Sequence, residues 1–354
     1  MAVLLVTDRT DPHVSRFSEA LKQRYDDFQL VTILGNGDSG PSAVVSGHEY
    51  TGWTGLSQAL EHSQGVIISG PLDSVTSRII SLKNPHIGVS WATDLMVTAA
   101  GNMKNLEVLS AAVRALDAVV TDNVAAENAL ISMGVSPDRI IRFAWGPEIP
   151  SSSVSPSSEP EAPRAERKVL FGRSIEDHYY PFAFIDAVEQ LNRSGVKANW
   201  CLIESGSLVD RVKEAIGDRR LEAQFSWIAA QSPSGFAKTL RECDVFVSTP
   251  RTDGTSVSLL EAMEAETLVV STLTNGSAEW VIDGITGLSC SPGNPSSLAL
   301  AIERALNLDS AYRNSIVSNA RRLVQSKAGW QEGVRELFRA IDLNLIDREK
   351  LRDE

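Results

Sequence analysis

The sequence is poor in cysteine and in long apolar runs, and both shortages exclude classes of protein. Its 354 residues include three cysteines, Cys201, Cys243 and Cys290, which lie far apart in apolar stretches. That spacing gives neither a disulfide framework nor a zinc site, so we expect buried thiols in the reducing cytoplasm. No apolar run is long enough to span a membrane. The opening residues, MAVLLVTDRTD, also lack the basic region of a signal peptide.

Positive charge is scarce as well. The chain has 33 Lys and Arg residues against 45 Asp and Glu residues, a formal net charge of -12. Nucleic acids select basic surfaces, so we expect no nucleic-acid partner. The basic residues of the first half are scattered rather than clustered, and peripheral attachment to a membrane therefore has no support from the sequence. The composition is that of a globular protein.

Short apolar runs alternate with helical patterns along the whole chain. In the first half we expect strands at 3–7, 28–34, 65–69, 87–90 and 118–121, with helices at 14–24, 56–62, 106–116 and 125–133. In the second half we expect strands at 169–172, 200–203, 225–228, 244–248 and 268–271, with helices at 181–191, 208–216, 235–240 and 256–264. Strands that alternate with helices predict an α/β fold of parallel sheets covered by helices.

A change of composition divides the chain into two domains. Residues 151–167, SSSVSPSSEPEAPRAER, are rich in serine, proline and charge, which is typical of a linker. This linker would separate an N-terminal domain at 1–150 from a C-terminal domain at 168–328. The last segment, 329–354, has the apolar spacing of an amphipathic helix.

Two carboxylates in the second half form the most informative pattern. Asp253 and Glu261 are separated by seven residues, and between them the turn Gly254-Thr255-Ser256 opens a predicted helix. The N-terminus of a helix offers unpaired N–H groups and a partial positive charge, which favour a phosphate. Carboxylates accept hydrogen bonds from hydroxyl groups. The turn and the helix together therefore suit a ligand that contains a sugar, a phosphate and a ribose.

This pattern resembles the acidic-x7-Glu motif of the retaining family-4 glycosyltransferases. The EAM sequence after Ser258, the apolar strand beyond it and the segment NGSAEWVIDGITGL at 275–288 extend the resemblance. It implies a GT-B fold, with two Rossmann-like domains that face a central cleft. The N-terminal domain would bind the acceptor and the C-terminal domain the nucleotide sugar, and the final helix would cross back to the first domain.

The resemblance also implies roles for particular residues of the motif. Asp253 would reach the hydroxyls of the donor sugar, and Glu261 would hold the ribose of the nucleotide. The backbone of Gly254, Thr255 and Ser256 would meet the donor phosphate or sugar. In relatives the loop that carries Asn275, Gly276 and Glu279 here touches the donor sugar or the base.

One departure from the family concerns the donor diphosphate. Relatives commonly read Gly-Arg after the first strand of the second domain, here Gly172-Arg173, and a Lys follows five or six residues later. The Lys is missing, and His178 or Tyr179 stands near its place. Three explanations stay open: Arg251 reaches in, His178 is protonated when phosphate binds, or the donor carries one phosphate, as a CMP-activated sugar does.

Four residues of the first half are candidates for the acceptor or the cleft. His13 and Arg16 lie in the sequence DPHVSRF, which resembles the loop and helix entry after the first strand of relatives. Trp91 occupies a place where many relatives have a His, and it would either stack on a sugar or pack in the core. Asp94 would contact the acceptor or cap a helix. Glu148 belongs to the turn that closes the first domain in relatives.

The sequence therefore predicts a retaining glycosyltransferase of glycan biosynthesis. It would move a sugar from a nucleotide sugar to a hydroxyl of a glycan, a protein-linked sugar, a lipid or a small molecule. We find no Asp-x-Asp motif and expect neither metal nor cofactor. The alternative is a non-enzymatic GT-B module that binds a sugar nucleotide or acts as a scaffold. Glu266 occupies the place where relatives have the Gly that ends the motif helix, and we predict no function for it.

Overall fold

The computed structural model describes residues 3–7, 12–37, 40–45, 48–62, 65–70, 72, 85–91, 94–95, 103–147 and 166–350. The chain divides into two compact units. Unit 1 comprises Met1–Phe143 together with Gln331–Glu354, and unit 2 comprises Ala144–Trp330. The linker predicted at 151–167 lies largely outside the described residues, as does Glu148.

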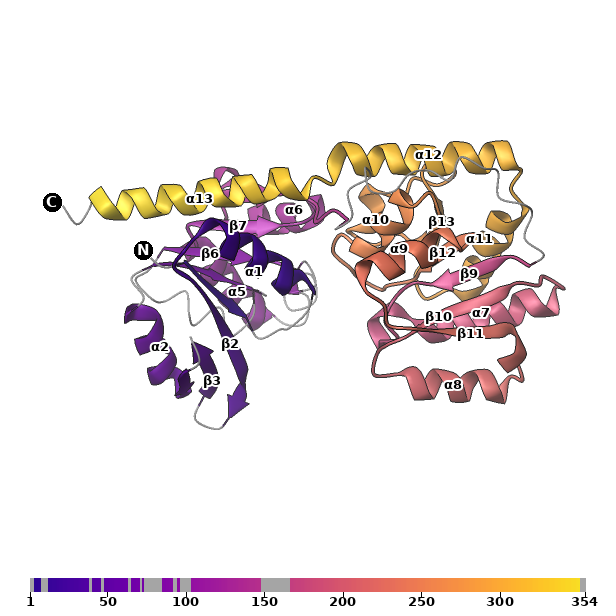
Figure 1. The fold of residues 1–354 in the computed structure, drawn as a ribbon, viewed down its shortest axis with the longest axis horizontal. Helices are drawn as coiled ribbons and strands as arrows, with labels where there is room; N and C mark the ends of the chain where they lie inside the picture. Colours follow the sequence, from indigo (N-terminus) through magenta and orange to yellow (C-terminus); the bar gives the residue numbers. More distant parts are fainter. Residues whose placement is uncertain are drawn as a thin grey trace. The chain divides into compact units, whose positions relative to one another are not determined.

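Unit 1 is built on a twisted sheet whose central strands are parallel (Figure 1). The sheet has the order β4-β3-β2-β1-β5-β6-β7-β8. Its elements are β1 (Val3–Thr7), α1 (Pro12–Arg24), β2 (Phe28–Gly37), β3 (Gly40–Val45), β4 (His48–Thr51), α2 (Gly52–His62), β5 (Val66–Ser69), β6 (His86–Val89), α5 (Met103–Ala115), β7 (Ala118–Thr121), α6 (Val124–Ser132) and β8 (Ile140–Arg142). Strands β1, β5, β6 and β7 are buried along their whole length, as parallel strands covered on two faces must be.

The sequence did not predict the antiparallel extension of this sheet. Strand β3 pairs with β2, and β4 with β3, in an antiparallel sense. The segment that forms them is rich in glycine and serine, so it carries a weak strand signal. Strand β8 was also not predicted, because its three residues are only partly buried and end in an arginine.

Unit 2 is a second parallel sheet, with the order β11-β10-β9-β12-β13-β14. Its elements are β9 (Lys168–Phe171), α7 (Pro181–Arg193), β10 (Asn199–Glu204), α8 (Val209–Asp218), β11 (Phe225–Ala229), α9 (Pro233–Arg241), β12 (Val245–Ser248), α10 (Val257–Glu264), β13 (Leu268–Thr272), β14 (Leu288–Cys290), α11 (Pro295–Asn307) and α12 (Ser310–Lys327). This is the strand order of a dinucleotide-binding fold, in which the first strand lies at the centre beside the fourth.

Helices cover both faces of the second sheet (Figure 1). Side chains of strand β12 pack into the cores on both of these faces. Val245 and Val247 pack in the core formed with α7, α8 and α11. Phe246, between them, packs in the core formed with α9, α10 and α12. Because side chains alternate along a strand, an unbroken apolar run can fill two cores at once. Packing on both faces of the sheet thereby fixes strand β12 and the position of its carboxyl end.

Helix α10 ends at Glu264 with Ala265 as its C-cap, and Glu266 follows in the left-handed conformation with φ of 60°. Its N–H bonds Met263 O at 3.2 Å, and the N–H of Thr267 bonds Ala262 O at 2.9 Å, which is the Schellman pattern. Glycine is the usual residue here. The Glu266 carboxylate instead lies 3.3 Å from Arg321 of α12, so this acid ties α10 to α12.

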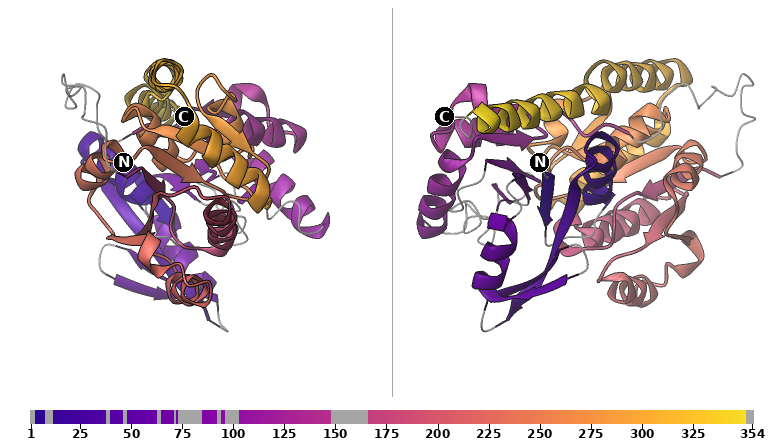
Figure 2. Two further views of the ribbon diagram at one scale, coloured as in Figure 1. Left: turned by 90° about the vertical axis from the view of Figure 1, so that its right-hand side faces the viewer. Right: turned by 60° about the vertical axis from the view of Figure 1, so that its left-hand side comes forward.

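The C-terminal helix α13 (Trp330–Lys350), the yellow helix of Figure 2, belongs almost entirely to unit 1. Tyr25 packs edge to face on Phe338, with ring centroids 5.8 Å apart, and its hydroxyl donates to Asp342 at 2.9 Å. Arg24 pairs with the same carboxylate at 3.0 Å. The predicted first domain ends at 150, whereas the structure divides after Phe143, because Gly146 lies against the backbone of Ala328.

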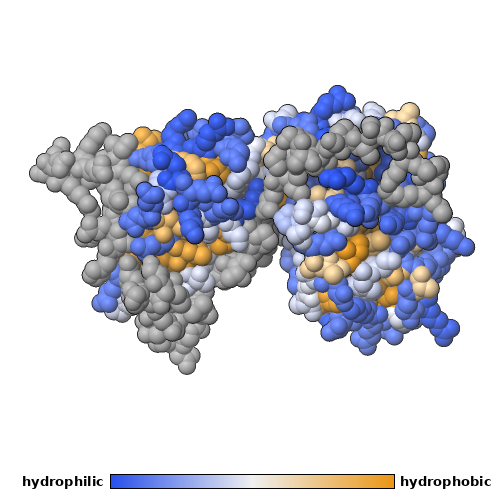
Figure 3. Space-filling model, in the orientation of Figure 1, coloured by the Kyte–Doolittle hydropathy of each residue, from blue (hydrophilic) through white to orange (hydrophobic). Residues whose placement is uncertain are grey.

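None of the helices in the described part of the chain is long and apolar enough to cross a bilayer. The three cysteines are free and buried. In Figure 3, hydrophilic residues dominate the visible surface of unit 2, with smaller apolar areas between them.

Strand β6 carries a buried histidine that should make unit 1 sensitive to acid. His86 is 2% exposed and its Nε2 lies 2.5 Å from Ser69 Oγ, while burial lowers the pKa of His86 from 6.5 to about 4. The unfolded chain binds a proton below pH 6.5 and the folded chain only near pH 4. Stability that is complete above pH 6.5 should therefore fall by about 3 kcal/mol on reaching pH 4.

Urea unfolding of the full chain between pH 7.5 and 4 would measure this loss. In His86→Gln, whose side chain does not titrate, the pH dependence should be shallower by that amount. An identical slope in the two proteins would contradict the assignment.

Candidate functional site

The candidate site lies at the carboxyl ends of β9, β12 and β13, which are neighbours in the second sheet. Ligands of open parallel sheets bind beyond these strand ends. The loop after β9 begins with Gly172, and a Cβ at this position would lie 1.9 Å from the ring of Phe246. Glycine is therefore required where the backbone passes the core, and this close passage delivers Arg173 to the strand ends.

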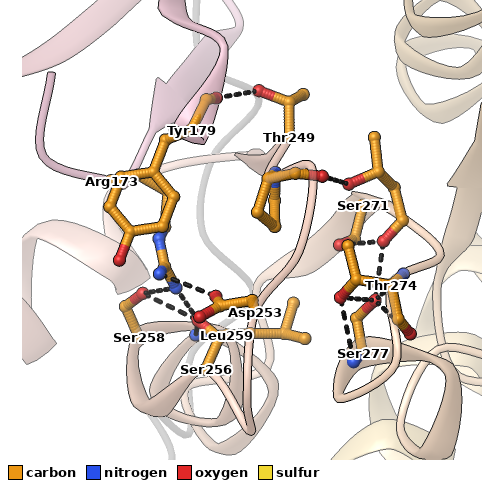
Figure 4. Close-up of polar contacts among 12 residues, drawn as sticks. Arg173, Tyr179, Thr249, Asp253, Ser256, Ser258, Leu259, Ser271, Thr274 and Ser277 are labelled. Atoms are coloured by element: carbon orange, nitrogen blue, oxygen red, sulfur yellow. Dashed lines mark hydrogen bonds and ion pairs between the residues drawn. The ribbon is translucent and has the colours of Figure 1, made fainter. Parts of the chain in front are cut away.

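Arg173 is the centre of the site (Figure 4). Its Nη2 donates to Asp253 Oδ2 at 2.7 Å, and its Nη1 donates to the hydroxyls of Ser256 and, at 3.2 Å, Ser258. The ring of Tyr179 covers the guanidinium face, with its centroid 4.0 Å from Cζ. Residues from two segments, the turn at Tyr179 and residues 253–258, thus hold one arginine in a defined orientation.

The ion pair between Arg173 and Asp253 is nearly dry. The two side chains are 8% and 14% exposed. Burial alone would lower the pKa of Arg173, but Asp253 and Tyr179 outweigh it and the pKa is raised. Burial raises the pKa of Asp253, and the adjacent Arg173 guanidinium opposes that shift. A charge in such surroundings depends strongly on its partner, since neither side chain is well solvated.

The pair sits at the start of helix α10. Ser256 is the N-cap of this helix, and its Oγ accepts from Leu259 N at 3.3 Å as well as from Arg173. The N-terminus of a helix carries a partial positive charge, to which the arginine adds a full one. Because a single carboxylate faces both, the site keeps an excess of positive charge that suits an anionic ligand.

The loops after β12 and β13 meet through glycine backbone. The N–H of Gly276 donates to Asp253 O at 3.2 Å. A Cβ at Gly276 would lie 2.0 Å from Gly254 O, too close for any other residue without movement. The predicted Gly254-Thr255-Ser256 turn is therefore packed directly against the Asn275–Gly276 turn, and Asn275 itself is exposed.

Buried hydroxyl groups keep these loops in place (Figure 4). Thr249 Oγ1 donates to Tyr179 O at 2.7 Å, which links the β12 loop to the β9 loop. Thr272 Oγ1 donates to Pro250 O at 2.8 Å, and Ser277 Oγ donates to Thr272 O at 2.7 Å. The backbone around Asp253 is thus hydrogen-bonded on both sides.

The segment in which the sequence resemblance predicts a lysine is a short 3-10 turn over Asp177–Tyr179. His178 is exposed and its ring lies against Tyr179, with centroids 3.9 Å apart. Partial burial of the imidazole lowers the pKa of His178, and Arg173 lowers it further, whereas Asp253 acts in the opposite direction. Without a bound anion, these surroundings therefore favour the neutral form of His178.

Arg251 lies beside the same turn. Its N–H donates to His178 O at 3.0 Å, and its guanidinium covers the ring of Tyr180 at 4.2 Å. The pattern of the sequence drew attention to Arg251 and Tyr179, but not to Tyr180 or Ser258. A Ser two residues after the helix cap is a weak signal, because its orientation depends on a partner far along the chain.

The remaining predicted donor residues lie on the same elements. Glu261 is half-buried, in the second turn of α10. Glu279 is half-buried at the end of the 3-10 turn Ser277–Glu279, and Thr255 is buried in the turn before Ser256.

The predicted residues of the first half belong to unit 1. Asp94 is 6% exposed and accepts hydrogen bonds from Leu72 N at 2.7 Å, Ser90 Oγ at 2.8 Å, Leu95 N at 2.9 Å and Trp91 N at 3.2 Å. It organises the chain around the end of β6.

Trp91 is 8% exposed and packs on Gly70, where a Cβ would meet its ring at 2.0 Å. Arg16 is half-buried on α1, and the side chain of His13 lies outside the described residues. The described residues contain no cluster of three or more His, Cys, Asp or Glu side chains that would suit a metal ion.

A family comparison agrees with this geometry. Residues 157–323 match the family model described as Glycosyl transferases group 1. This range contains every residue of the candidate site. Most of unit 2 is therefore similar to a glycosyltransferase group 1 domain.

Two curated proteins of Methanocaldococcus jannaschii, each named as an uncharacterized glycosyltransferase, are similar to this chain. They are 26% identical to it over 157 and 185 residues, which is 44% and 48% of this chain. The matches span 42% and 47% of those relatives, less than half of their length.

Solved structures resemble the chain over 88% to 100% of its length. HepE of Anabaena, solved with UDP and glucose, has a TM-score of 0.70 at 15% identity and covers 100% of each chain. A glycosyltransferase of Rickettsia africae has a TM-score of 0.69 at 13% identity, covering 97% of this chain and 98% of its own. The pneumococcal O-GlcNAc transferase GtfA, solved with UDP and GlcNAc, has a TM-score of 0.64 at 10% identity, covering 88% of this chain and 64% of its own. The predicted GT-B fold is confirmed.

The effects of substituting Arg173 and Asp253 on the free energy of unfolding should be strongly non-additive. Asp253→Asn leaves the Arg173 charge without its partner and should lower the free energy of unfolding by about 2–4 kcal/mol. The double variant with Arg173→Gln should lose less than the sum of the single losses, with a coupling of about 1–3 kcal/mol in urea unfolding.

The exposed pair Arg304–Asp283, at 2.8 Å with both side chains 44% exposed, is the matched control. Its coupling should stay below about 1 kcal/mol. Equal couplings for the two pairs would contradict a special role of burial at Arg173.

The close contact between Gly276 and Gly254 O can be tested by substitution. Gly276→Ala forces a methyl group against Gly254 O and should cost about 1–3 kcal/mol of stability by overpacking. Gly217→Ala in α8 is the control, since its Cβ would approach no atom closer than Glu222 Oε1 at 3.6 Å. The control should be neutral or slightly stabilising. Thermal melting of the two variants would show the difference, and equal melting temperatures would count against the packed loops.

Proposed function

We propose that the chain is a retaining, metal-independent glycosyltransferase that moves a sugar from a nucleotide sugar to a hydroxyl acceptor. One observation carries the proposal: in the segment that matches the glycosyltransferase group 1 model, a buried Arg173 meets the N-terminus of α10 at the carboxyl ends of the strands. A guanidinium and a helix N-terminus that converge on one point suit a phosphate.

The donor would use four parts of this site. Arg173 would bind the phosphate, and Asp253 would keep that arginine oriented and meet hydroxyls of the donor sugar. Glu261, on the helix that starts at Ser256, would hold the ribose. The packed turn around Gly276 would close the sugar site with backbone rather than side chains, because glycine lets a ligand approach closely.

The transfer itself is a substitution at the anomeric carbon. The bond from this carbon to the phosphate oxygen breaks, and a bond to the acceptor oxygen forms. The proton of the acceptor hydroxyl passes to the departing phosphate oxygen, which acts as the base on the same face of the sugar. The protein would contribute by stabilising the charge that develops on the phosphate, through Arg173 and the α10 N-terminus. This route uses no metal ion and no protein nucleophile, and it retains the anomeric configuration.

The acceptor is a hydroxyl compound for which unit 1 would provide the contacts. We place the reaction in the cytoplasm, a proposal supported by the three free cysteines. The solved relatives with UDP favour a nucleoside diphosphate over CMP as the carrier.

Calorimetry with UDP, GDP, dTDP and CMP, and with their common sugars, would test the donor site. Glu261→Ala should weaken the nucleotide that binds the wild type by about tenfold or more, because a ribose hydroxyl loses a charged partner. Glu214→Ala, which removes an exposed acid of α8, should leave the affinity unchanged.

Binding of no nucleotide by the folded protein would overturn the proposal in favour of a scaffold module. Transfer with inversion, seen in the anomeric signal of the product by NMR, would overturn the retaining mechanism alone.

A further inference from the structure

Two consecutive tyrosines each lie against an arginine at the strand ends of unit 2. The ring of Tyr179 lies 4.0 Å from the guanidinium carbon of Arg173, and the ring of Tyr180 lies 4.2 Å from that of Arg251. Guanidinium groups bind aromatic faces and keep their N–H edges directed outward. One short segment thus orients two cations from two different loops.

The two arginines follow neighbouring strands. Arg173 comes two residues after β9, and Arg251 three residues after β12, and these strands are paired in parallel with Val247 opposite Phe171. Two hydrogen bonds fix the tyrosine turn to the β12 loop. Arg251 N donates to His178 O at 3.0 Å, and Thr249 Oγ1 donates to Tyr179 O at 2.7 Å. The two cations therefore belong to one hydrogen-bonded unit.

Tyr180 adopts a conformation that tyrosine rarely takes. Its φ of 53° and ψ of 51° lie in the left-handed region, directly before Pro181 at the start of α7. A residue other than glycine in this region costs of order 1 kcal/mol and persists where the surroundings enforce it. Here the left-handed turn directs the ring of Tyr180 to Arg251, while Tyr179 remains on Arg173.

The two arginines differ in how closely an acidic side chain balances their charge. Arg173 is buried and faces Asp253 at 2.7 Å, so much of its charge is already balanced. Arg251 is 54% exposed, and its ion pair with the 81% exposed Asp177 is long, at 4.0 Å. A phosphate group can readily replace an exposed contact of that kind. A diphosphate carries a negative charge on each phosphate, which is more than Arg173 and the helix N-terminus can balance alone.

We propose that Arg251, held on the face of Tyr180, is the second phosphate-binding cation and makes the site selective for a diphosphate over a monophosphate. This inference rests on the proposed function, because it assigns the donor phosphates to these two arginines. Arg173 binds one phosphate at the start of α10, and Arg251 binds the other from the β12 loop. Tyr180 is a positioning residue, which lowers the entropy that Arg251 loses on binding.

The test compares affinities for UDP, GDP and dTDP, their monophosphates and inorganic pyrophosphate by calorimetry at one fixed salt concentration. Arg251→Ala should weaken the diphosphate and pyrophosphate by about tenfold or more and the monophosphate by much less. Tyr180→Leu should weaken the same ligands by a few fold, through loss of the ring face, whereas Tyr180→Phe should not. The selective loss for diphosphates is a readout that general unfolding does not produce.

Arg211→Ala is the matched control. Arg211 is an exposed arginine of α8 whose guanidinium lies 5.5 Å from the centroid of the Phe182 ring, so this variant removes the same charge and the same kind of contact. It should leave every affinity within twofold or so of the wild type, as expected for an exposed charge that solvent and salt screen and that has no place in the proposed phosphate site. Melting temperatures of all variants would verify that they are folded.

The outcomes separate this inference from the function on which it rests. If the wild type binds a nucleoside diphosphate and Arg251→Ala resembles Arg211→Ala, the inference is overturned and the donor site stands. If the wild type binds pyrophosphate through Arg251 but no nucleotide, the phosphate site stands and the proposed donor is overturned. A wild type that binds none of these ligands overturns both.

Discussion

The buried ion pair between Arg173 and Asp253 is the interaction on which the rest of the site depends. It joins the loop after β9 to the loop after β12, and the serines at the start of α10 complete it. A buried ion pair contributes little net stability compared with apolar residues of the same size, but it penalises every arrangement in which the charges separate. The pair thus fixes which residues face one another at the strand ends.

This dependence explains why the glycines and hydroxyl groups of the site matter. Arg173 can meet Asp253 only because Gly172 passes close to Phe246, and Asp253 keeps its place because Gly276 packs on Gly254. None of these groups need touch a ligand to be required. Loss of function in a variant of this region would therefore need a stability measurement beside it, since packing and binding use the same residues.

The sequence predicted the parallel strands and their helices well, because buried strands are continuous apolar runs and the helices carry clear periodicity. It failed at β3 and β4, whose pairing is antiparallel and whose residues include few strand formers. It also predicted Arg173 and Asp253 as candidate site residues, and the structure brings the two together. It could not predict their ion pair, because the two residues are 80 positions apart and meet only through the pairing of β9 with β12. The left-handed Tyr180 was hidden for a similar reason, since its neighbours enforce a conformation that tyrosine does not prefer.

The hydroxyl contacts of Thr249, Thr272 and Ser277 have a consequence for the thermodynamics of ligand capture. Ordering one residue of a loose loop costs about 1–2 kcal/mol of conformational entropy. In this unit the hydroxyls of Thr249, Thr272 and Ser277 donate to the backbone carbonyls of Tyr179, Pro250 and Thr272, which orders the loops after β9, β12 and β13. Their conformational entropy is therefore lost when the chain folds, and a ligand that binds at the strand ends need not order them again.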